Sequence, residues 1–225
     1  MKNKKTNNEN PKERKLKGNW FYFAVKRLVD LLASFFAILL LSLVLIGVAI
    51  AVKCSSKGPA IFADKRVGKN GKEIKVLKFR SMYIDAESNI DKYLTPEQKE
   101  IWLRERKLEN DPRITKVGRF IRKTSLDELP QLFNIFIGTM SFVGTRPITV
   151  RELETHFTEE EQNIIKSGKP GLTGYWQVYG RGEAEYETGE RQKLELEYFY
   201  KRGLFFDLKI LFLTIPAVLK HKGAK

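Results

Sequence analysis

The longest apolar stretch of the chain is residues 31–52, which contain no charged side chain. At about 1.5 Å per residue, a helix over this range would be about 33 Å long, enough to cross the hydrocarbon core of a bilayer. A cleaved signal peptide fits poorly, because the run is long and no clear small-residue cleavage site follows it. The pattern therefore predicts a membrane-inserted helix near the amino terminus.

Both flanks of this run are basic. Residues 1–27 carry nine Lys or Arg against two Glu, and residues 53–80 carry nine against one Asp and one Glu. Positive charge marks the cytoplasmic side of a membrane segment. Either the helix spans the bilayer and one basic flank lies outside, or the segment enters and returns on the same side. We favour the re-entrant form, which needs a break, although Ser42 and Gly47 are weak breakers.

The next stretch predicts a β-hairpin followed by polar helix. IFADKRV and EIKVLKFRSM alternate as strands do and flank a Gly-Lys-Asn-Gly turn at residues 68–71. Residues 85–109 predict a helix that is interrupted near Pro96, where Thr95 can cap a new start. Three further features are expected: a turn at 110–113, a helix at 159–166, and a loop with a short strand in KPGLTGYWQVYGRG.

The carboxyl-terminal stretch predicts an amphipathic helix, with Pro216 expected to kink or end it. The apolar positions that share one helical face are Leu204, Phe205, Leu208, Leu211 and Phe212. This face packs into the core, or it lies in the bilayer interface with Lys209, Lys220 and Lys222 towards the headgroups. Both interpretations stay open.

Composition restricts the kinds of site and partner. The 225 residues include 42% hydrophobic ones, enough to bury a core, and carry a formal charge of +14. A single Cys excludes an intrachain disulfide, and with two His the chain has too few ligands for a usual zinc site. A basic excess suits nucleic acid or an anionic membrane. The uncharged run at 31–52 favours the membrane and argues against nucleic acid as a partner.

Candidate chemistry lies in TSLDELPQLFNIFIGTMSFVGTRP, residues 124–147, where Asp127 and Glu128 stand among helix-start signals and basic side chains. Ser125 and Glu128 have the spacing of a capping box. Alternatively Asp127 is the N-cap and Pro130 falls in the first turn. Under either frame the two carboxylates could be caps only. A helix dipole would also keep Asp127 ionised, as a nucleophile requires.

Several ordered motifs resemble the bacterial sugar transferases, the monotopic polyprenol-phosphate phosphoglycosyl transferases. They are KRLVD before the membrane helix, KFRSM after the hairpin, NDPRITKVGRFIRKTSLDELPQLFNIFIGTMSFVGTRP, PGLTGYWQVYGRG and FFDLKILFLT, and together they extend over residues 25–219. The resemblance implies transfer of a phospho-sugar from a UDP-sugar to polyprenyl (undecaprenyl) phosphate, with release of UMP. It implies a place on the cytoplasmic face of the bacterial inner membrane, where exopolysaccharide, capsule or related glycans begin.

The resemblance also implies the roles of the site residues. Asp127 would attack the β-phosphate and form an aspartyl-phosphosugar intermediate, while Glu128, with Asp127, would hold Mg²⁺. Guanidinium and ammonium groups offset charge on phosphoryl oxygens. The candidates for binding the phosphates and the nucleotide are Lys78, Arg80, Arg113, Arg122, Arg146 and Arg181.

We therefore expect an α+β, mostly helical fold, with a membrane-inserted helix, a small hairpin and interfacial amphipathic helices around a compact cytosolic catalytic domain. Its expected parts are a basic disordered arm at 1–19, a membrane-inserted segment at 20–56, a catalytic domain at 57–219 and a basic tail at 220–225. The alternative is a non-catalytic basic membrane adaptor of a polysaccharide-assembly complex, which explains charge and anchor but not the Asp-Glu pair. The sugar, the glycan pathway and a homo-oligomer are left open.

Overall fold

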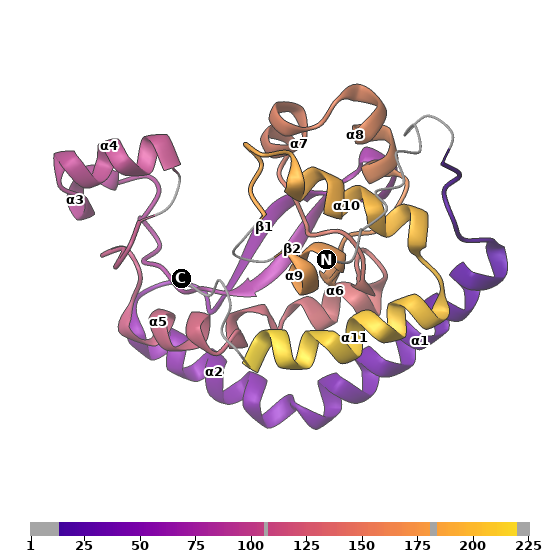
Figure 1. Ribbon diagram of the computed structural model, residues 1–225. Coiled ribbons are helices and arrows are strands. Elements are labelled where there is room, and N and C mark those ends of the chain that lie inside the picture. Colours follow the sequence, from indigo (N-terminus) through magenta and orange to yellow (C-terminus); the bar gives the residue numbers. More distant parts are fainter. Residues whose placement is uncertain (1–13, 106–107, 181–183, 220–225) are drawn as a thin grey trace, which may run out of the picture.

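The computed structural model describes residues 14–105, 108–180 and 184–219. Within them the fold is mostly helical and includes two small two-stranded sheets, in agreement with the expected class (Figure 1). The helices are α1 (Trp20–Leu40), α2 (Ser42–Ser55), α3 (Ile90–Tyr93), α4 (Pro96–Glu105), α5 (Lys116–Lys123), α6 (Gln131–Ile137), α7 (Val150–His156), α8 (Glu159–Lys166), α9 (Tyr175–Tyr179), α10 (Glu190–Lys201) and α11 (Leu204–Leu219). The strands are β1 (Ile61–Val67), β2 (Glu73–Phe79), β3 (Ser141–Val143) and β4 (Gly171–Thr173), and the 3-10 turns are η2 (Lys69–Gly71) and η3 (Leu126–Glu128).

The amino-terminal helical segment is bent. The axes of α1 and α2 differ by 64°, and the backbone at Leu41 between them has φ −92° and ψ 8°. α1 packs against α6, whereas α2 packs against α5 and β2. Because no proline lies at the break, these separate contacts account for the bend. The break adjoins Ser42, one of the two weak breakers expected from the sequence.

The bent pair also carries the membrane signal. No single described helix combines the length and the apolar content needed to cross a bilayer. α1 and α2 meet that requirement only when taken together, on length and composition. The part of the expected arm that the structure describes, residues 14–19, lies against α10, where Arg14 pairs with Glu197 at 2.7 Å. Residues 1–13 of the arm and the tail at 220–225 lie outside the described residues.

The predicted hairpin is confirmed. β1 and β2 pair antiparallel with Ile61 opposite Phe79 and Val67 opposite Glu73. Two consecutive residues of the connecting turn have positive φ, Asn70 at 60° and Gly71 at 72°; asparagine and glycine tolerate this conformation better than most residues. The hairpin is the long pair of strands at the centre of Figure 1.

The expected helix at 85–109 divides into α3 and α4, which project from one side of the molecule (Figure 1). Thr95 caps α4 as expected: its hydroxyl accepts from the Gln98 amide at 3.3 Å, and the Gln98 side chain accepts from the Thr95 amide at 3.1 Å. The helix expected at 159–166 is α8, with the expected bounds.

The larger core lies around the short parallel pair β3 and β4, between α7, α10 and α11. Its buried members include Val143, Ile148, Phe157, Phe199 and Ile210. β4 is the short strand expected in KPGLTGYWQVYGRG. The rest of that stretch was expected to be loop, but residues 175–179 form helix α9. α9 packs against α10 and α11, and this burial outweighs the loop signal of the flanking glycines.

Helix α11 packs into the core on one side and leaves apolar side chains exposed on the other, and its contact with a bilayer stays a prediction. Ile210 is fully buried and Leu211 packs against the core, while Phe205 is 90% exposed and Phe212 65% exposed. Of the two effects expected of Pro216, ending the helix is excluded, because α11 continues to Leu219; a kink stays a prediction. Lys220 and Lys222 lie outside the described residues.

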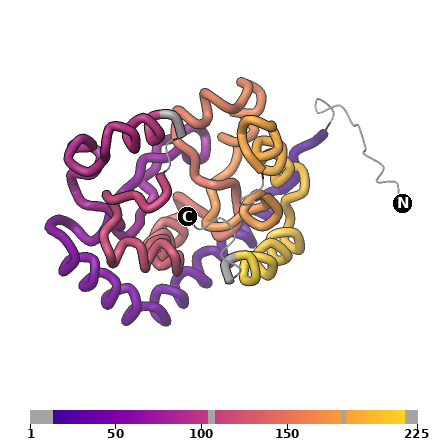
Figure 2. The backbone as a smooth tube through the Cα atoms, turned by 60° about the vertical axis from the view of Figure 1, so that its left-hand side comes forward, coloured from indigo at the N-terminus to yellow at the C-terminus, as the bar shows by residue number. Residues whose placement is uncertain are grey.

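Large apolar side chains stay exposed on α1, α2, α5, α6 and α11. α1, α2 and α11 run along one side of the molecule in both views (Figures 1 and 2), and α5 and α6 pack on α2 and α1. We call this set the apolar face; its members include Phe36, Leu40, Leu43, Ile46, Ile50, Phe120, Phe136, Ile137, Phe205 and Phe212. Exposed apolar surface of this extent is typical of a membrane or protein contact.

Candidate active site

The Asp127–Glu128 pair, here called the dyad, lies in the 3-10 turn η3 between α5 and α6. Ser125 adopts the left-handed conformation with φ 56° and makes no capping bond through its side chain. Helix α6 starts only at Gln131, with Pro130 at the capping position. Both capping frames expected from the sequence are therefore wrong, because the chain makes a separate turn before the helix begins.

Asn134 of α6 fixes the dyad segment to the hairpin. Its Oδ1 accepts from the Leu77 amide at 2.8 Å, and its Nδ2 donates to the Lys75 carbonyl at 2.7 Å. An α-helical side chain thus occupies the backbone groups that a further strand would have paired. This attachment places Lys78, the next residue of β2, near Asp127.

Helix α5 brings a guanidinium to the same place. Gly118 packs so closely on the Ser81 carbonyl that a Cβ at this position would lie 1.9 Å from the oxygen. Glycine therefore allows α5 to lie directly on the segment that follows β2. One turn later Arg122 donates through Nε to the Ser81 hydroxyl at 2.8 Å, and its positive charge acts on Asp127.

The electrostatics of Asp127 follow from this arrangement. The pKa of Asp127 is raised from 3.8 to about 6. Burial is the largest cause and the neighbouring Glu128 carboxylate acts in the same direction, while Lys78 and Arg122 act in the opposite direction. The sequence led us to expect a carboxylate kept ionised by a helix dipole. Here two cations do part of that work against burial, and the group titrates close to neutral pH.

A cavity of about 1240 Å³ opens over the dyad. Its lining brings together all the sequence-predicted site residues that the structure describes: Lys78, Arg80, Arg113, Arg122, Asp127, Glu128 and Arg146. Arg66, Arg119 and Lys123 add further positive charge, and Tyr83 and Trp102 add aromatic surface. Arg181 lies outside the described residues. A basic cavity with two carboxylates suits a polyanionic ligand of diphosphate type.

Arg80 and Arg113 are held by acceptors within the protein. Arg80 is buried and donates to the carbonyls of Ser56 at 2.8 Å and of Lys57, beyond the end of α2. Arg113 is 3% exposed and pairs with both oxygens of Asp111, with 2.6 Å from Nη2 to Oδ2. This geometry indicates that both arginines support the cavity wall, and it gives no support to phosphate binding by either. That role stays a prediction.

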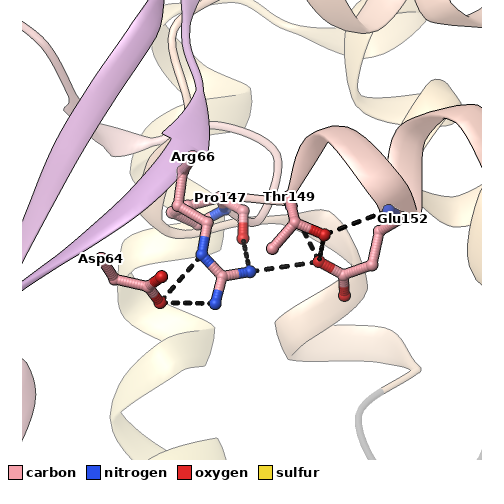
Figure 3. A network of polar contacts seen from close by, with 5 residues as sticks. All are labelled: Asp64, Arg66, Pro147, Thr149 and Glu152. Carbon is pink, nitrogen blue, oxygen red and sulfur yellow. Dashed lines mark hydrogen bonds and ion pairs between the residues drawn. The ribbon is translucent and has the colours of Figure 1, made fainter. Parts of the chain in front are cut away.

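Arg146 lies in the turn between β3 and α7. Arg66 contacts this turn at the next residue, Pro147 (Figure 3). The Arg66 guanidinium pairs with Asp64 at 2.5 Å, with Glu152 at 3.1 Å, and donates to the Pro147 carbonyl at 3.4 Å. Glu152 in turn closes a capping box with Thr149. Strand β1, the Arg146 turn and helix α7 are therefore joined by one side chain at the cavity wall.

Comparison with known proteins decides the family. A family model described as bacterial sugar transferase matches residues 21–221. The chain belongs to the bacterial sugar transferase family. The resemblance drawn from the ordered motifs is thereby confirmed.

Individual members of the family are similar over most of the chain. Identity is 41% to the exopolysaccharide production protein ExoY of Rhizobium meliloti, covering 88% of this chain and 87% of that protein. It is 42% to an undecaprenyl-phosphate galactose phosphotransferase of Salmonella typhimurium and 43% to a UDP-glucose:undecaprenyl-phosphate glucose-1-phosphate transferase of Escherichia coli, each covering 89% of this chain and 41% of the relative. The chain thus spans less than half the length of these two relatives.

The dyad is compatible with a Mg²⁺ ion that is bound partly by the substrate. The described residues contain no group of three or more His, Cys, Asp and Glu placed to hold a metal ion. Mg²⁺, however, is commonly bound through one or two carboxylates together with substrate phosphates and water. Asp127 and Glu128, side by side in the cavity, fit an ion that arrives with a diphosphate. The Mg²⁺ site stays a prediction.

Four polar residues of this sugar transferase escaped the sequence reasoning: Asp64, Arg66, Arg191 and Glu195. Asp64 and Arg66 line the cavity. They are two positions apart in the predicted strand and so share one of its faces, which is the signal that could have indicated them. Glu195 is buried on α10, and Arg191 lies one turn before it. Their surroundings come from four separate segments, so no local pattern marks them.

Proposed function

We propose that this protein transfers a sugar 1-phosphate from a UDP-sugar to undecaprenyl phosphate and releases UMP, so starting the assembly of an exopolysaccharide, capsule or related glycan. The observation that carries the proposal is the position of the dyad. It lies in a basic cavity, and α5 contributes Arg119, Arg122 and Lys123 to that cavity while its Phe120 belongs to the apolar face. The names of the relatives from Salmonella typhimurium and Escherichia coli support the reaction class.

In the first step a carboxylate oxygen of Asp127 attacks the β-phosphorus of the UDP-sugar. The bond from this phosphorus to the oxygen that bridges the two phosphates breaks, and UMP leaves with that oxygen. An aspartyl-phosphosugar remains. Lys78 and Arg122 favour the ionised form of Asp127 before attack, and their charges offset the negative charge on the phosphoryl oxygens during it.

In the second step a phosphate oxygen of undecaprenyl phosphate attacks the same phosphorus. The bond to Asp127 breaks, the carboxylate is restored, and the product is undecaprenyl diphospho-sugar. Two displacements at one phosphorus allow the donor and the acceptor to use the same cavity in turn, which a carboxylate nucleophile makes possible. Arg146 is the predicted contact to the donor phosphates. It lines the cavity, its backbone amide donates to Glu195, and the carbonyl of the next residue, Pro147, accepts from Arg66.

Magnesium would be held by Glu128 together with Asp127 and would supply positive charge at the diphosphate oxygens. Apart from any metal ion, Glu128 acts on Asp127 through its charge. Its carboxylate raises the pKa of Asp127, so neutralising Glu128 makes the nucleophile less basic.

The lipid acceptor explains the apolar face. The phosphate of undecaprenyl phosphate lies at the depth of the lipid headgroups, so the dyad must be close to the bilayer surface to reach it. We propose that α1 and α2 enter the bilayer and return on the cytoplasmic side, with the apolar face in contact with lipid. Labelling of Lys17→Cys and Lys57→Cys, each in a Cys54→Ser background, tests this in sealed vesicles. Both sites become labelled from the same side in a re-entrant protein, and from opposite sides in a spanning one.

The reaction is tested with membrane preparations, undecaprenyl phosphate and a panel of UDP-sugars. The wild-type protein is expected to release UMP and form lipid-linked product with at least one donor, and Asp127→Asn is expected to do neither. A non-catalytic membrane adaptor would show no UMP release with any donor, and that result would replace the transferase with the adaptor.

A further inference from the structure

Behind Arg146, away from the dyad, planar side chains form a continuous column. His156 stacks on Tyr186 with ring centroids 4.0 Å apart and planes at 2°. The Arg191 guanidinium lies between Tyr186 and Trp176, at 4.0 Å and 4.2 Å from the two ring centroids. Arg146 lies 5.6 Å from the Trp176 centroid. The column therefore ends at a residue that lines the cavity.

The column carries an unusual number of buried polar atoms without hydrogen bonds. Among the described residues these include the Trp176 Nε1, the Tyr186 hydroxyl, and Nε and Nη2 of Arg191. Burial lowers the pKa of Arg191, but the acidic groups around it act in the opposite direction. A buried guanidinium with unused donors is costly, so a structure that keeps it has a use for its charge or its shape.

Glu195 is the acidic group that joins this column to Arg146. Its side chain is 2% exposed, and its Oε2 accepts from the Arg146 amide at 3.2 Å. Arg191 and Arg146 both face it with positive charge, whereas Glu152 faces it with negative charge. Burial raises the pKa of Glu195 to about 7, and the other oxygen, Oε1, has no hydrogen-bond partner.

We propose that Glu195 is a positioning residue for Arg146. It accepts the hydrogen bond of the Arg146 amide. Its negative charge also attracts Arg191, which stacks on Trp176, and the Arg146 guanidinium lies over the same ring. Arg66, which also pairs with Glu152, donates to the Pro147 carbonyl of the same turn. The guanidinium is thus set in place before the donor arrives, which lowers the entropy cost of binding a diphosphate.

The inference rests on the proposed function only through the role of Arg146, so it is tested by binding as well as by turnover. The probe is UDP, and its Kd is measured by calorimetry on the full-length protein in detergent. Glu195→Gln keeps the shape of the side chain, and Glu197→Gln on the same helix is the matched control, because Glu197 pairs with Arg14 and Lys201 instead. We expect Glu195→Gln to weaken UDP binding about tenfold, as for a lost charge-assisted contact, and Glu197→Gln to leave it unchanged.

A double-variant comparison separates positioning from general destabilisation. In an Arg146→Ala background, Glu195→Gln is expected to change the UDP Kd less than twofold, because the residue through which it acts is gone. Trp176→Leu is also expected to weaken UDP binding when Arg146 is present and to change the Kd less than twofold when Arg146 is replaced by Ala. Trp176→Phe, which keeps a ring face, should retain most of the affinity. Equal effects of Glu195→Gln with and without Arg146 overturn the inference, as does unchanged binding in the single variant.

The two proposals fail in different ways. A protein that binds UDP with this pattern but forms no lipid-linked product supports the positioning role and overturns the transferase reaction. A protein that forms product while Glu195→Gln keeps the wild-type Kd and the wild-type KM for the UDP-sugar overturns the positioning role alone. A wild-type protein that binds no UDP overturns the positioning role directly.

Discussion

Asn134 and Leu77 are joined by a hydrogen bond of 2.8 Å between the side-chain oxygen of one and the backbone amide of the other. The same side chain donates to the Lys75 carbonyl at 2.7 Å. Helix α6 and strand β2 are thereby held in one register. That register sets the separation of Lys78 from Asp127, and the positive charge of Lys78 favours the ionised form of Asp127.

Replacing Asn134 by Ala is expected to destabilise the protein by about 1–3 kcal/mol, because the buried Asn134 side chain is lost and the part-buried Leu77 amide and Lys75 carbonyl lose their partner. Thermal unfolding in detergent measures the change. Asn89→Ala, at an exposed asparagine, is the control and should change the stability by less than about 0.5 kcal/mol. An Asn134→Ala protein as stable as this control would show that the hydrogen bonds of Asn134 to β2 do not stabilise the fold.

The rate of UMP release in a single turnover should fall below pH 6. Asp127 must be ionised to attack, and its pKa is raised to about 6, so the rate should drop about tenfold per pH unit below that value. Glu128→Gln should move the midpoint to lower pH, because a neighbouring negative charge is removed. Lys78→Met should move it to higher pH. A midpoint that is the same in all three proteins would exclude Asp127 as the titrating group.

Asp127→Asn should be inactive yet more stable than the wild type at pH 7.5. The pKa of Asp127 is higher in the folded protein than its ordinary value of 3.8, so the group favours folding at low pH and this contribution is lost as the pH rises through 6. Removing the charge relieves a penalty of at most about 3 kcal/mol. Chemical denaturation at pH 7.5 and at pH 4 measures it, and the gain should nearly vanish at pH 4. Equal gains at both pH values would contradict it.

The apolar face should contact acyl chains. A fluorophore on Phe205→Cys, in a Cys54→Ser background, is expected to be quenched by brominated lipid, because this position is 90% exposed on α11 and has no core contact to lose. Leu103→Cys on the projecting helix α4, 54% exposed, is the matched control and should not be quenched. Quenching at both positions, or at neither, would contradict the proposed orientation.

Local patterns predicted the parts of the fold that local forces decide. The hairpin follows from two strand-like runs around a Gly-Lys-Asn-Gly turn. The helix expected at 159–166 is α8, and the structure adds a capping box of Thr158 and Glu161 at its start. Helix α9 was missed because packing of Trp176, rather than the propensity of its neighbours, makes it helical. The position of the bend in the amino-terminal segment was expected only loosely, since contacts of α1 and α2 with different helices determine it.

The site shows the same division. The dyad and the described basic candidates could be assigned from ordered motifs, and the fold places all of them at one cavity. The role of each basic residue could not be assigned from the sequence. Arg80 donates to the Ser56 carbonyl, which is distant in the sequence, and Arg113 pairs with Asp111, a contact that only burial in the fold creates. The prediction that Ser125 or Asp127 caps the helix was wrong, because Ser125 adopts a left-handed conformation and the turn η3 lies between it and the start of α6.

The central claim is that Asp127 carries the sugar phosphate between donor and acceptor. The most direct measurement is trapping: protein is mixed with UDP-sugar labelled with ³²P at the β-phosphate, without undecaprenyl phosphate, and quenched in acid. The label is expected on the peptide that contains Asp127, to disappear on addition of undecaprenyl phosphate, and to be absent from Asp127→Asn. Label retained by Asp127→Asn, or lipid-linked product formed at the wild-type rate by that variant, would contradict the account.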